Sequence, residues 1–357
     1  MSGMDYINDI KSKIAAGTTI TGIDFSNKSF AKVDLSGAIF ISCRFTNAIF
    51  KECNFNHGSF MQCDFEAASF SHNVTMPCFM QCRFVGSKWA GDCITVTICE
   101  GDLSKSSWIN CHIKTSSFSQ CDFDASKWVG CHFDTTSLSA VQGENVKLKQ
   151  CQFNNVTWMG TNFSTFDIQQ CSYTQALLIG CDFSRLDLTG IRLTKSTCND
   201  GKFIGSNLSK GFLNETGFTN CIFHKSDLSG AMLQKSLFIN SKIDTCNFSG
   251  CDLSGSNFQA ASISKSDFSD SNMSQVWLKS MNADKTNFSS TDLSHANISY
   301  ATVNDCDFSN SHCHATNIHA LTDDKSNWKG VDKTQVITTD KTQQQLDKHL
   351  SEYGVNA

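Results

Sequence analysis

The chain has 357 residues and a net charge of −5, with 29 basic and 34 acidic side chains, and this near balance argues against a basic nucleic-acid-binding surface. Its 19 cysteines do not indicate a disulfide framework, because such frameworks belong to short chains and the count here is odd. No 18 apolar residues run together and no apolar leader is visible at the start. We therefore expect a soluble cytoplasmic protein that does not bind membranes, with non-classical secretion left open.

The first predicted element is a short amphipathic helix over residues 4–16. Its apolar side consists of isoleucines at the spacing i, i+3, i+7: Ile7, Ile10 and Ile14. Gly17 follows as an end signal. We expect residues 1–19 to form an N-terminal helical cap.

Across residues 20–330 a large apolar residue, here termed the centre, returns at every fifth position. Neither an amphipathic helix, with a period near 3.6, nor a half-buried strand, with a period of 2, produces this spacing. The pattern therefore indicates a structure other than ordinary helices and sheets. Typical centres are Phe25, Phe30, Leu35, Phe40, Trp108, Phe118, Trp128, Phe248, Leu253 and Phe258.

The register of centres is interrupted twice by a four-residue step. The first step follows Phe70, and the second follows Ile94 in our assignment. Removing one residue should tighten a corner and kink or offset the stack near residues 71–75 and 95–97. A later centre position is occupied by Gly143, where the apolar pattern breaks.

Small residues, often cysteines, stand two positions before many centres. Residues two apart in an extended chain point to the same side, so the small and large residues should enter one interior. We predict that these cysteines are free thiols, buried as small hydrophobic residues. They are Cys43, Cys53, Cys63, Cys82, Cys111, Cys121, Cys131, Cys151, Cys171, Cys181, Cys221, Cys246, Cys251 and Cys306.

The phrases CDFDA, SDLSG, CDLSG and TDLSH share a small residue, then Asp, then Phe or Leu. The chain resembles the pentapeptide-repeat family in this pattern, and the resemblance covers nearly all residues from about Ile20 to Trp328. The resemblance implies an all-β solenoid, a right-handed quadrilateral β-helix with four pentapeptides in each square coil. A twenty-residue coil would stack Trp89, Trp108 and Trp128 on one face.

The last predicted element is a helix within the C-terminal segment 331–357. Asp340 should cap its N-terminus and Gly354 should end it. Its apolar side is expected to consist of Leu346, Leu350 and Tyr353. Because an open solenoid end exposes a sheet edge, the helix could act as a cap; it could equally form a homodimer through residues 341–353. Both readings stay open.

The sequence indicates no catalytic constellation. A convex rod with short turns offers no water-poor concavity, and the common nucleotide, zinc-protease, dithiol and serine-nucleophile motifs do not occur. We therefore expect no enzyme, no cofactor and no metal. A transition-metal site is conceivable only at His312, His314 and His319, which are more simply explained as surface histidines.

The residue before each centre should face solvent, and one column of these positions is acidic. Its carboxylates are Asp167, Asp187, Asp227, Asp267 and Asp307, and from Asp187 onwards an asparagine stands between successive carboxylates. The family includes DNA-mimicking proteins that bind type II topoisomerases such as gyrase and confer quinolone resistance, so the resemblance implies this partner as an alternative. Duplex DNA, however, carries about one charge per 1.7 Å, and this chain has a net charge of only −5, so it would reproduce the charge density of DNA poorly.

Other solvent-facing positions hold apolar side chains: Phe212, Ile222, Met232, Leu237 and Trp277. Phe212 and Met232 should lie on successive coils of one face, with Leu237 just round the corner. Contiguous groups of aromatic residues and methionine are typical of protein-binding surfaces. The main hypothesis is a non-enzymatic bacterial interaction scaffold whose rigid rod binds another protein, of unknown identity. A secreted effector or effector adaptor is a further alternative.

Overall fold

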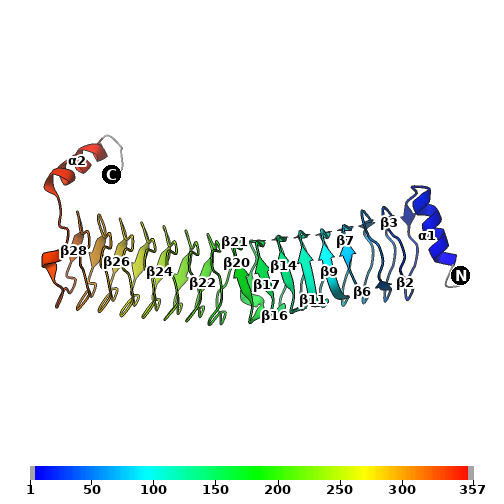
Figure 1. Cartoon of the computed structure of the whole chain (residues 1–357), viewed down its shortest axis with the longest axis horizontal. Helices are drawn as coiled ribbons and strands as arrows, with labels where there is room; N and C mark the ends of the chain where they lie inside the picture. Colours follow the sequence, from blue (N-terminus) through cyan, green and yellow to red (C-terminus); the bar gives the residue numbers. More distant parts are fainter. Residues whose placement is uncertain (1–4, 353–357) are drawn as a thin grey trace. The chain divides into compact units, whose positions relative to one another are not determined.

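The computed structural model describes residues 5–352, which belong to two compact units, Met1–Asp182 and Phe183–Ala357. Each unit is a solenoid of short parallel strands joined by tight turns (Figure 1). Within the described residues, no helix is both long enough and apolar enough to cross a membrane.

The first unit begins with helix α1, Asp5–Ala15, and contains two parallel sheets. The nine-stranded sheet has the order β1 (Ile20–Thr21), β3 (Ile39–Ile41), β5 (Ser59–Met61), β8 (Cys78–Met80), β10 (Thr97–Cys99), β12 (Ser117–Ser119), β15 (Ser137–Ser139), β18 (Thr157–Met159) and β21 (Leu177–Ile179).

The twelve-stranded sheet of the first unit follows a second side. Its main path consists of β2 (Ser29–Ala31), β4 (Ile49–Lys51), β6 (Ser69–Ser71), β9 (Lys88–Ile94), β11 (Ser107–Lys114), β13 (Lys127–Val129), β16 (Lys147–Lys149) and β19 (Asp167–Gln169). Beside this path lie β7 (Val74–Thr75), β14 (His132–Asp134), β17 (Gln152–Asn154) and β20 (Ser172–Thr174). A 3-10 helix spans Phe163–Thr165.

The second unit has one seven-stranded sheet and a C-terminal helix. The strands are β22 (Lys202–Ile204), β23 (Ile222–His224), β24 (Lys242–Asp244), β25 (Ser262–Ser264), β26 (Asn282–Asp284), β27 (Thr302–Asn304) and β28 (Thr322–Asp324). A 3-10 helix at Lys333–Gln335 and helix α2, Lys341–Glu352, follow.

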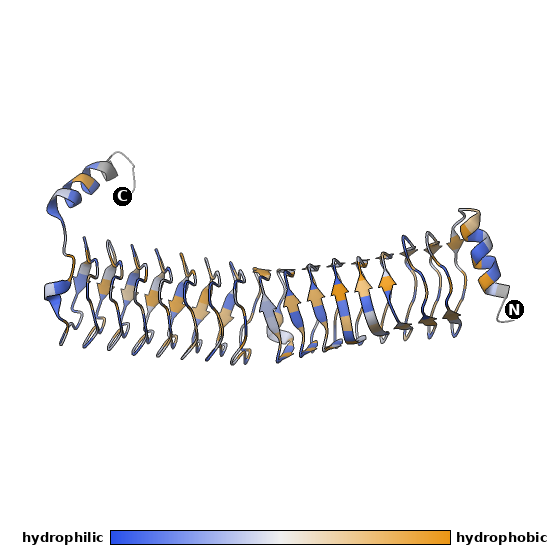
Figure 2. Ribbon diagram, viewed as in Figure 1, coloured by the Kyte–Doolittle hydropathy of each residue, from blue (hydrophilic) through white to orange (hydrophobic). Residues whose placement is uncertain are grey.

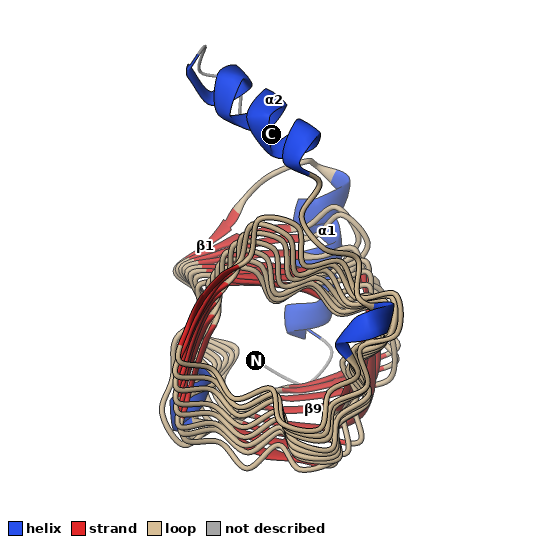
Figure 3. Ribbon diagram, turned by 90° about the vertical axis from the view of Figure 1, so that its left-hand side faces the viewer, coloured by secondary structure: helices blue, strands red, loops and turns tan. Residues whose placement is uncertain are grey.

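Each coil takes twenty residues, or nineteen where a four-residue step falls, and has four sides. Most strand partners are twenty residues apart, as in the pair Phe203 and Phe223, whose rings stack with centroids 4.7 Å apart. Four successive centres of one coil, Phe203, Leu208, Leu213 and Phe218, are all fully buried. Viewed along the solenoid, strands and turns form walls around this interior (Figure 3). The strands carry both hydrophobic and hydrophilic residues (Figure 2). The predicted all-β solenoid is confirmed.

The predicted burial of the cysteines is also confirmed. All 19 are free, and every cysteine two positions before a centre is buried. Their sulfurs lie near backbone carbonyls, as where Cys111 Sγ donates to the oxygen of Trp89 at 3.3 Å. Burial raises the pKa of the Cys121 thiol to about 12. These thiols therefore behave as core side chains.

The two four-residue steps are real, but the second is not where the sequence pattern placed it. The buried residue that pairs with Val74 is Cys93, whereas Ile94 is only half-buried, so this step lies between Trp89 and Cys93. Gly91 makes the tight corner with φ of +106°, and a Cβ there would lie 3.0 Å from the backbone of the preceding coil. The sheet stays paired through both steps, with a register shift between β9 and β11.

Helix α1 agrees with the predicted helix and lies against the first coil. Ile10 is fully buried, while Ile7 and Ile14 are only half-buried. The main anchor is Tyr6, which the apolar pattern did not include. Its ring meets Phe30 edge-on at 5.5 Å, and its hydroxyl donates to the carbonyl of Ser29 at 2.7 Å.

Helix α2 begins as predicted, because Asp340 Oδ1 accepts the backbone N–H groups of Thr342 and Gln343 at 2.8 and 3.2 Å. The predicted apolar side is not confirmed, since Leu346 is 49% exposed. The side chain of Leu350, and residues Tyr353 and Gly354, lie outside the described part of the chain. Dimerisation through this helix stays a prediction.

A polar cluster attaches α2 to the last coils of its unit. Asp347 is buried and accepts hydrogen bonds from the hydroxyl of Tyr300, from His319 Nε2 at 3.2 Å and from Gln343 Nε2 at 2.6 Å. His319 Nδ1 accepts the N–H of Asp340 at 3.3 Å. His319 is therefore buried, not solvent-facing as predicted, because the helix covers it.

The indole ladder should dominate the stability of the first unit. Trp108 is fully buried between Trp89 and Trp128, at centroid distances of 4.3 and 4.5 Å. We expect Trp108→Ala to lower the free energy of unfolding by about 3–5 kcal/mol, measured by denaturant titration, because a large cavity replaces two stacking contacts. Trp277→Ala, at a side chain that is 50% exposed, should change it by less than about 0.5 kcal/mol. Equal effects would contradict the ladder's contribution.

The attachment of α2 should depend on pH. The hydrogen bond from Tyr300 lowers the pKa of Asp347, while burial and the same bond raise the pKa of Tyr300 to about 12. The stabilising contribution of Asp347 to the attachment of α2 is therefore complete above about pH 3.9 and is lost below it. The contribution of Tyr300 to this attachment is complete below about pH 10 and is lost as the pH rises through about 12.

Hydrogen exchange of α2, corrected for intrinsic rates, should show a loss of protection as the pH falls below about 3.9 and a second loss as the pH rises through about 12. The acid loss should be absent in Asp347→Asn, and the alkaline loss should be absent in Tyr300→Phe. Protection that is equal at pH 3 and pH 7 in the unmodified chain would contradict this attachment.

Candidate partner-binding surfaces

The structure brings together three of the five predicted apolar residues. Phe212 pairs with Met232 on the next coil, and their side chains are 36% and 41% exposed. Leu237, 41% exposed, follows Met232 after one corner of the same coil. The predicted placement of Phe212 and Met232 on successive coils of one face is confirmed. We name Phe212, Met232 and Leu237 the Phe212 surface.

The other two predicted residues lie apart from this group. Ile222 is on β23, in the sheet that forms another side of the coil. Trp277 is in the same column as Leu237, but Asn257 stands on the coil between them. Outward columns recur every twenty residues. Leu237 and Trp277 are forty residues apart, so they share a column but lie two coils apart.

The Phe212 surface has a mostly basic border. The guanidinium of Arg192, one coil before Phe212, lies over its ring at 4.3 Å. Lys210 occupies the corner before Phe212, and Lys235 occupies the corner between Met232 and Leu237; both are exposed. The acidic side chains of the border are Glu215, at a neighbouring corner, and Asp252, which pairs with Met232 on the next coil. The surface thus combines apolar area with three positive and two negative charges.

The acidic column of the second unit is in register but carries a carboxylate only on every second coil. From Asp227 to Asp307 the column alternates Asp and Asn. Asp267 Oδ1 accepts the N–H of Ser269 at 3.0 Å and the amide of Asn287 at 2.9 Å.

The charge spacing in this column is therefore wide. With coils about 4.8 Å apart, its carboxylates recur at about 9.6 Å, compared with about 1.7 Å per charge in duplex DNA. Asp187 is exposed, and hydrogen bonds from Thr189 lower its pKa. Asp167 belongs to the first unit, on β19, so it is not part of the described column of the second unit.

The structure does not assemble the three predicted histidines. His314 Nδ1 is paired with Gln335, and its ring lies 5.4 Å from that of His295. His319 instead belongs to the cluster that holds α2. Among the side chains of the described chain, no three from His, Cys, Asp and Glu are arranged to hold a metal ion.

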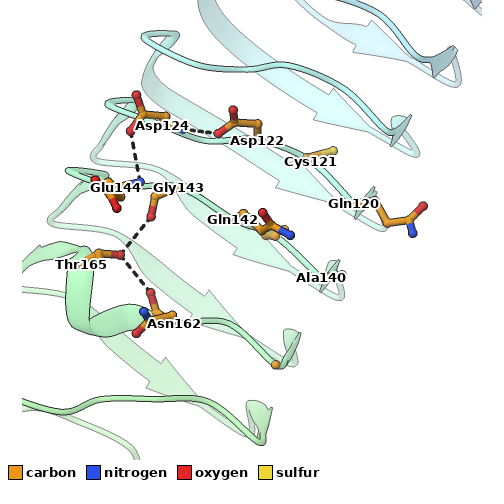
Figure 4. A pocket seen from close by; sticks show the side chains of 12 residues that line it. Gln120, Cys121, Asp122, Asp124, Ala140, Gln142, Gly143, Glu144, Asn162 and Thr165 are labelled. Carbon is orange, nitrogen blue, oxygen red and sulfur yellow. Dashed lines mark hydrogen bonds between the residues drawn. The ribbon is translucent and has the colours of Figure 1, made fainter.

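An open hollow of about 820 Å³ surrounds the break at Gly143 (Figure 4). Any Cβ at this glycine would lie 2.9 Å from the backbone of Asp124, so the coil comes unusually close here. Thr165 Oγ1 donates to the Gly143 carbonyl at 2.9 Å, and the N–H of Glu144 donates to Asp124 Oδ1 at 3.2 Å. The carboxylate of Asp124 thus takes part in the local backbone structure. The missing centre was the sequence signal for this hollow.

A second exposed group escaped the sequence analysis. On the nine-stranded sheet, Ile41, Met61, Met80 and Cys99 occupy one outward column on four neighbouring strands. Ile39 and Cys78 lie in the parallel outward column beside it. The sequence contained the signal for this group, because its residues directly precede or follow a centre and such positions face solvent.

Comparisons with known proteins agree with this architecture. The family model described as pentapeptide repeats (8 copies) matches residues 29–66, 171–209 and 202–238, and the model described as pentapeptide repeat region matches residues 241–318. No curated protein matches the chain significantly.

Several solved structures are similar in fold. HetL, a pentapeptide repeat protein involved in heterocyst differentiation regulation in the cyanobacterium Nostoc sp. strain PCC 7120, is 14% identical, with 76% of this chain and 91% of HetL covered and a TM-score of 0.25. A trypsin-treated form of QnrB1, a plasmid-mediated fluoroquinolone resistance protein, is 16% identical, with coverages of 75% and 100% and a TM-score of 0.24. Because the two matching repeat models together cover about half of the sequence, the chain belongs to the pentapeptide-repeat family.

Proposed function

We propose that this protein is a non-enzymatic interaction scaffold, and that the Phe212 surface binds a partner protein through a segment carrying both apolar and acidic side chains. The observation that carries the proposal is the pair of exposed side chains Phe212 and Met232 on successive coils, with Leu237 past the next corner and three cations, Arg192, Lys210 and Lys235, beside them. Pentapeptide-repeat proteins are generally non-enzymatic structural or binding proteins, which supports a scaffold role.

The backbone beneath this surface is already ordered. The N–H of Phe212 donates to the carbonyl of Ile191 at 2.8 Å, and that of Met232 donates to Gly211 at 2.9 Å. Each side chain therefore projects from a backbone position that is hydrogen-bonded to the preceding coil. A surface of this kind loses little conformational entropy on binding, so its apolar area can contribute more of its transfer free energy to affinity.

The border determines which partner chemistry fits. Arg192, Lys210 and Lys235 would be unfavourable next to a basic segment and favourable next to carboxylates. Arg192 already stacks on Phe212, so a carboxylate bound there would contact a cation held in place by the ring. A segment with both apolar and acidic side chains would match the apolar residues of the Phe212 surface and the cations beside them.

The alternative is topoisomerase binding by DNA mimicry through the acidic column. Its carboxylates are widely spaced, and those of Asp227, Asp267 and Asp307 each accept a backbone N–H two residues further on. This arrangement explains the column as a repeated turn structure, and it weakens the resemblance to a phosphate backbone.

Affinity capture from a bacterial lysate, followed by titration of the purified partner, tests the two surfaces against each other. We expect Met232→Asp to weaken binding at least about tenfold, because it places a carboxylate in the apolar centre. Lys210→Glu with Lys235→Glu should weaken it further and reduce its salt dependence. Trp277→Asp is the matched control, an exposed apolar residue outside the surface, and should bind as the unmodified chain does.

The contrary outcome is equally specific. Capture of gyrase that is unchanged in Met232→Asp but lost in Asp227→Asn with Asp267→Asn would overturn this placement and support the acidic column. Binding lost equally in Met232→Asp and Trp277→Asp would also contradict it, because those residues do not lie on one contiguous surface.

A further inference from the structure

We propose that the outward face of β5, β8 and β10, in the first unit, holds a site for a soft monovalent metal ion, Cu(I), formed by the thiols of Cys78 and Cys99 and the thioether of Met80. This site is independent of the Phe212 surface. It revises the expectation of no metal, which came from a search for histidine and cysteine spacings of zinc type.

The two cysteines of this site differ from all the others. Cys78 and Cys99 are half-buried, whereas every other cysteine of the chain is buried. The reason is their position in the repeat. Cys78 directly precedes the centre Phe79, and Cys99 directly follows the centre Ile98, so both side chains point outward while the centres point inward. Their sulfurs are therefore accessible to a ligand in the folded protein.

Strand register places Met80 beside both thiols. Met80 pairs directly with Cys99 on the neighbouring strand, and it lies two residues after Cys78 on the same side of β8. The spacings are about 4.8 Å between strands and about 6.6 Å along a strand. Met80 thus occupies the corner of a right-angled arrangement, and its flexible side chain can place sulfur between the two thiols.

Cu(I) would bind the two cysteines as thiolates, and their protons would be released to solvent. Met61 pairs with Met80 from the opposite side and offers a second thioether on the same column.

The donor set selects the metal. Thiolate and thioether sulfur are soft ligands that favour Cu(I), whereas zinc sites take Cys, His, Asp or Glu and usually four ligands. Beside the column, Gln62, Gln81 and Glu100 form a hydrogen-bonded side-chain ladder, with bonds of 3.2 and 2.9 Å. Glu100 thereby adds a negative charge next to Cys99 that favours a cation.

All three donors lie on paired β-strands, which hold side chains more rigidly than loops do. The three donors come from two neighbouring coils, so the ion would link those coils across the outer surface. A bound ion should therefore raise the resistance of this region to opening.

The test is an anaerobic titration of the reduced full chain against a chromophoric Cu(I) chelator, with ascorbate present. We expect the unmodified chain to withdraw one equivalent of Cu(I) from the chelator. Cys78→Ser with Cys99→Ser should withdraw none, and Met80→Leu should bind at least about tenfold more weakly. Cys251→Ala, at a buried thiol of the other unit, is the matched control and should retain the equivalent.

X-ray absorption of the copper-loaded chain gives a second readout that is independent of affinity. It should show only sulfur ligands, about three in number, decreasing to two in Met80→Leu. Circular dichroism of each variant must match that of the unmodified chain, because unfolding would expose the buried thiols. No uptake, uptake unchanged in the double cysteine variant, or tighter binding of Zn²⁺ than of Cu(I) would each overturn the proposal.

Discussion

The backbone hydrogen bond between one coil and the next is the interaction on which both units depend. It requires each residue to find a partner about one coil away, whatever side chains the coil carries. Where a residue is missing, the partner lies nineteen positions away, as in the pair Phe70 and Trp89, and the ladder of hydrogen bonds continues. The aromatic stacks and the outward columns both follow from this register.

The period of five was sufficient to predict the centres, the buried cysteines and the adjacency of Phe212 and Met232. Each is a consequence of register alone, and register is local and repetitive. The second four-residue step was misplaced, because either Cys93 or Ile94 could follow Trp89 as an inward residue. The conformational freedom of Gly91 decides between them by allowing the tight corner two residues after Trp89. That choice depends on the neighbouring coil, which the period does not describe.

Contacts between elements of different type were the other class of error. The position of His319 within the repeat correctly indicates an outward residue, but α2 covers it through Asp347. No repeat encodes this contact, because the helix follows its own period and Asp347 lies twenty-eight residues further along the chain. The outward sulfur group at Met80 was missed for the opposite reason. Its residues obey the repeat, and only the comparison of neighbouring coils shows that similar side chains accumulate there.

The reactivity of the buried thiols can report local opening of this fold. Burial raises the pKa of Cys121, Cys221 and Cys251 to about 12, which keeps these three thiols protonated and unreactive while the coils are closed. Because they are distributed along both units, the labelling rate of each thiol by an alkylating reagent would report how often its own coil exposes the interior. A solenoid whose coils contact only their neighbours can open one segment at a time, so these rates would form a residue-resolved profile of local stability.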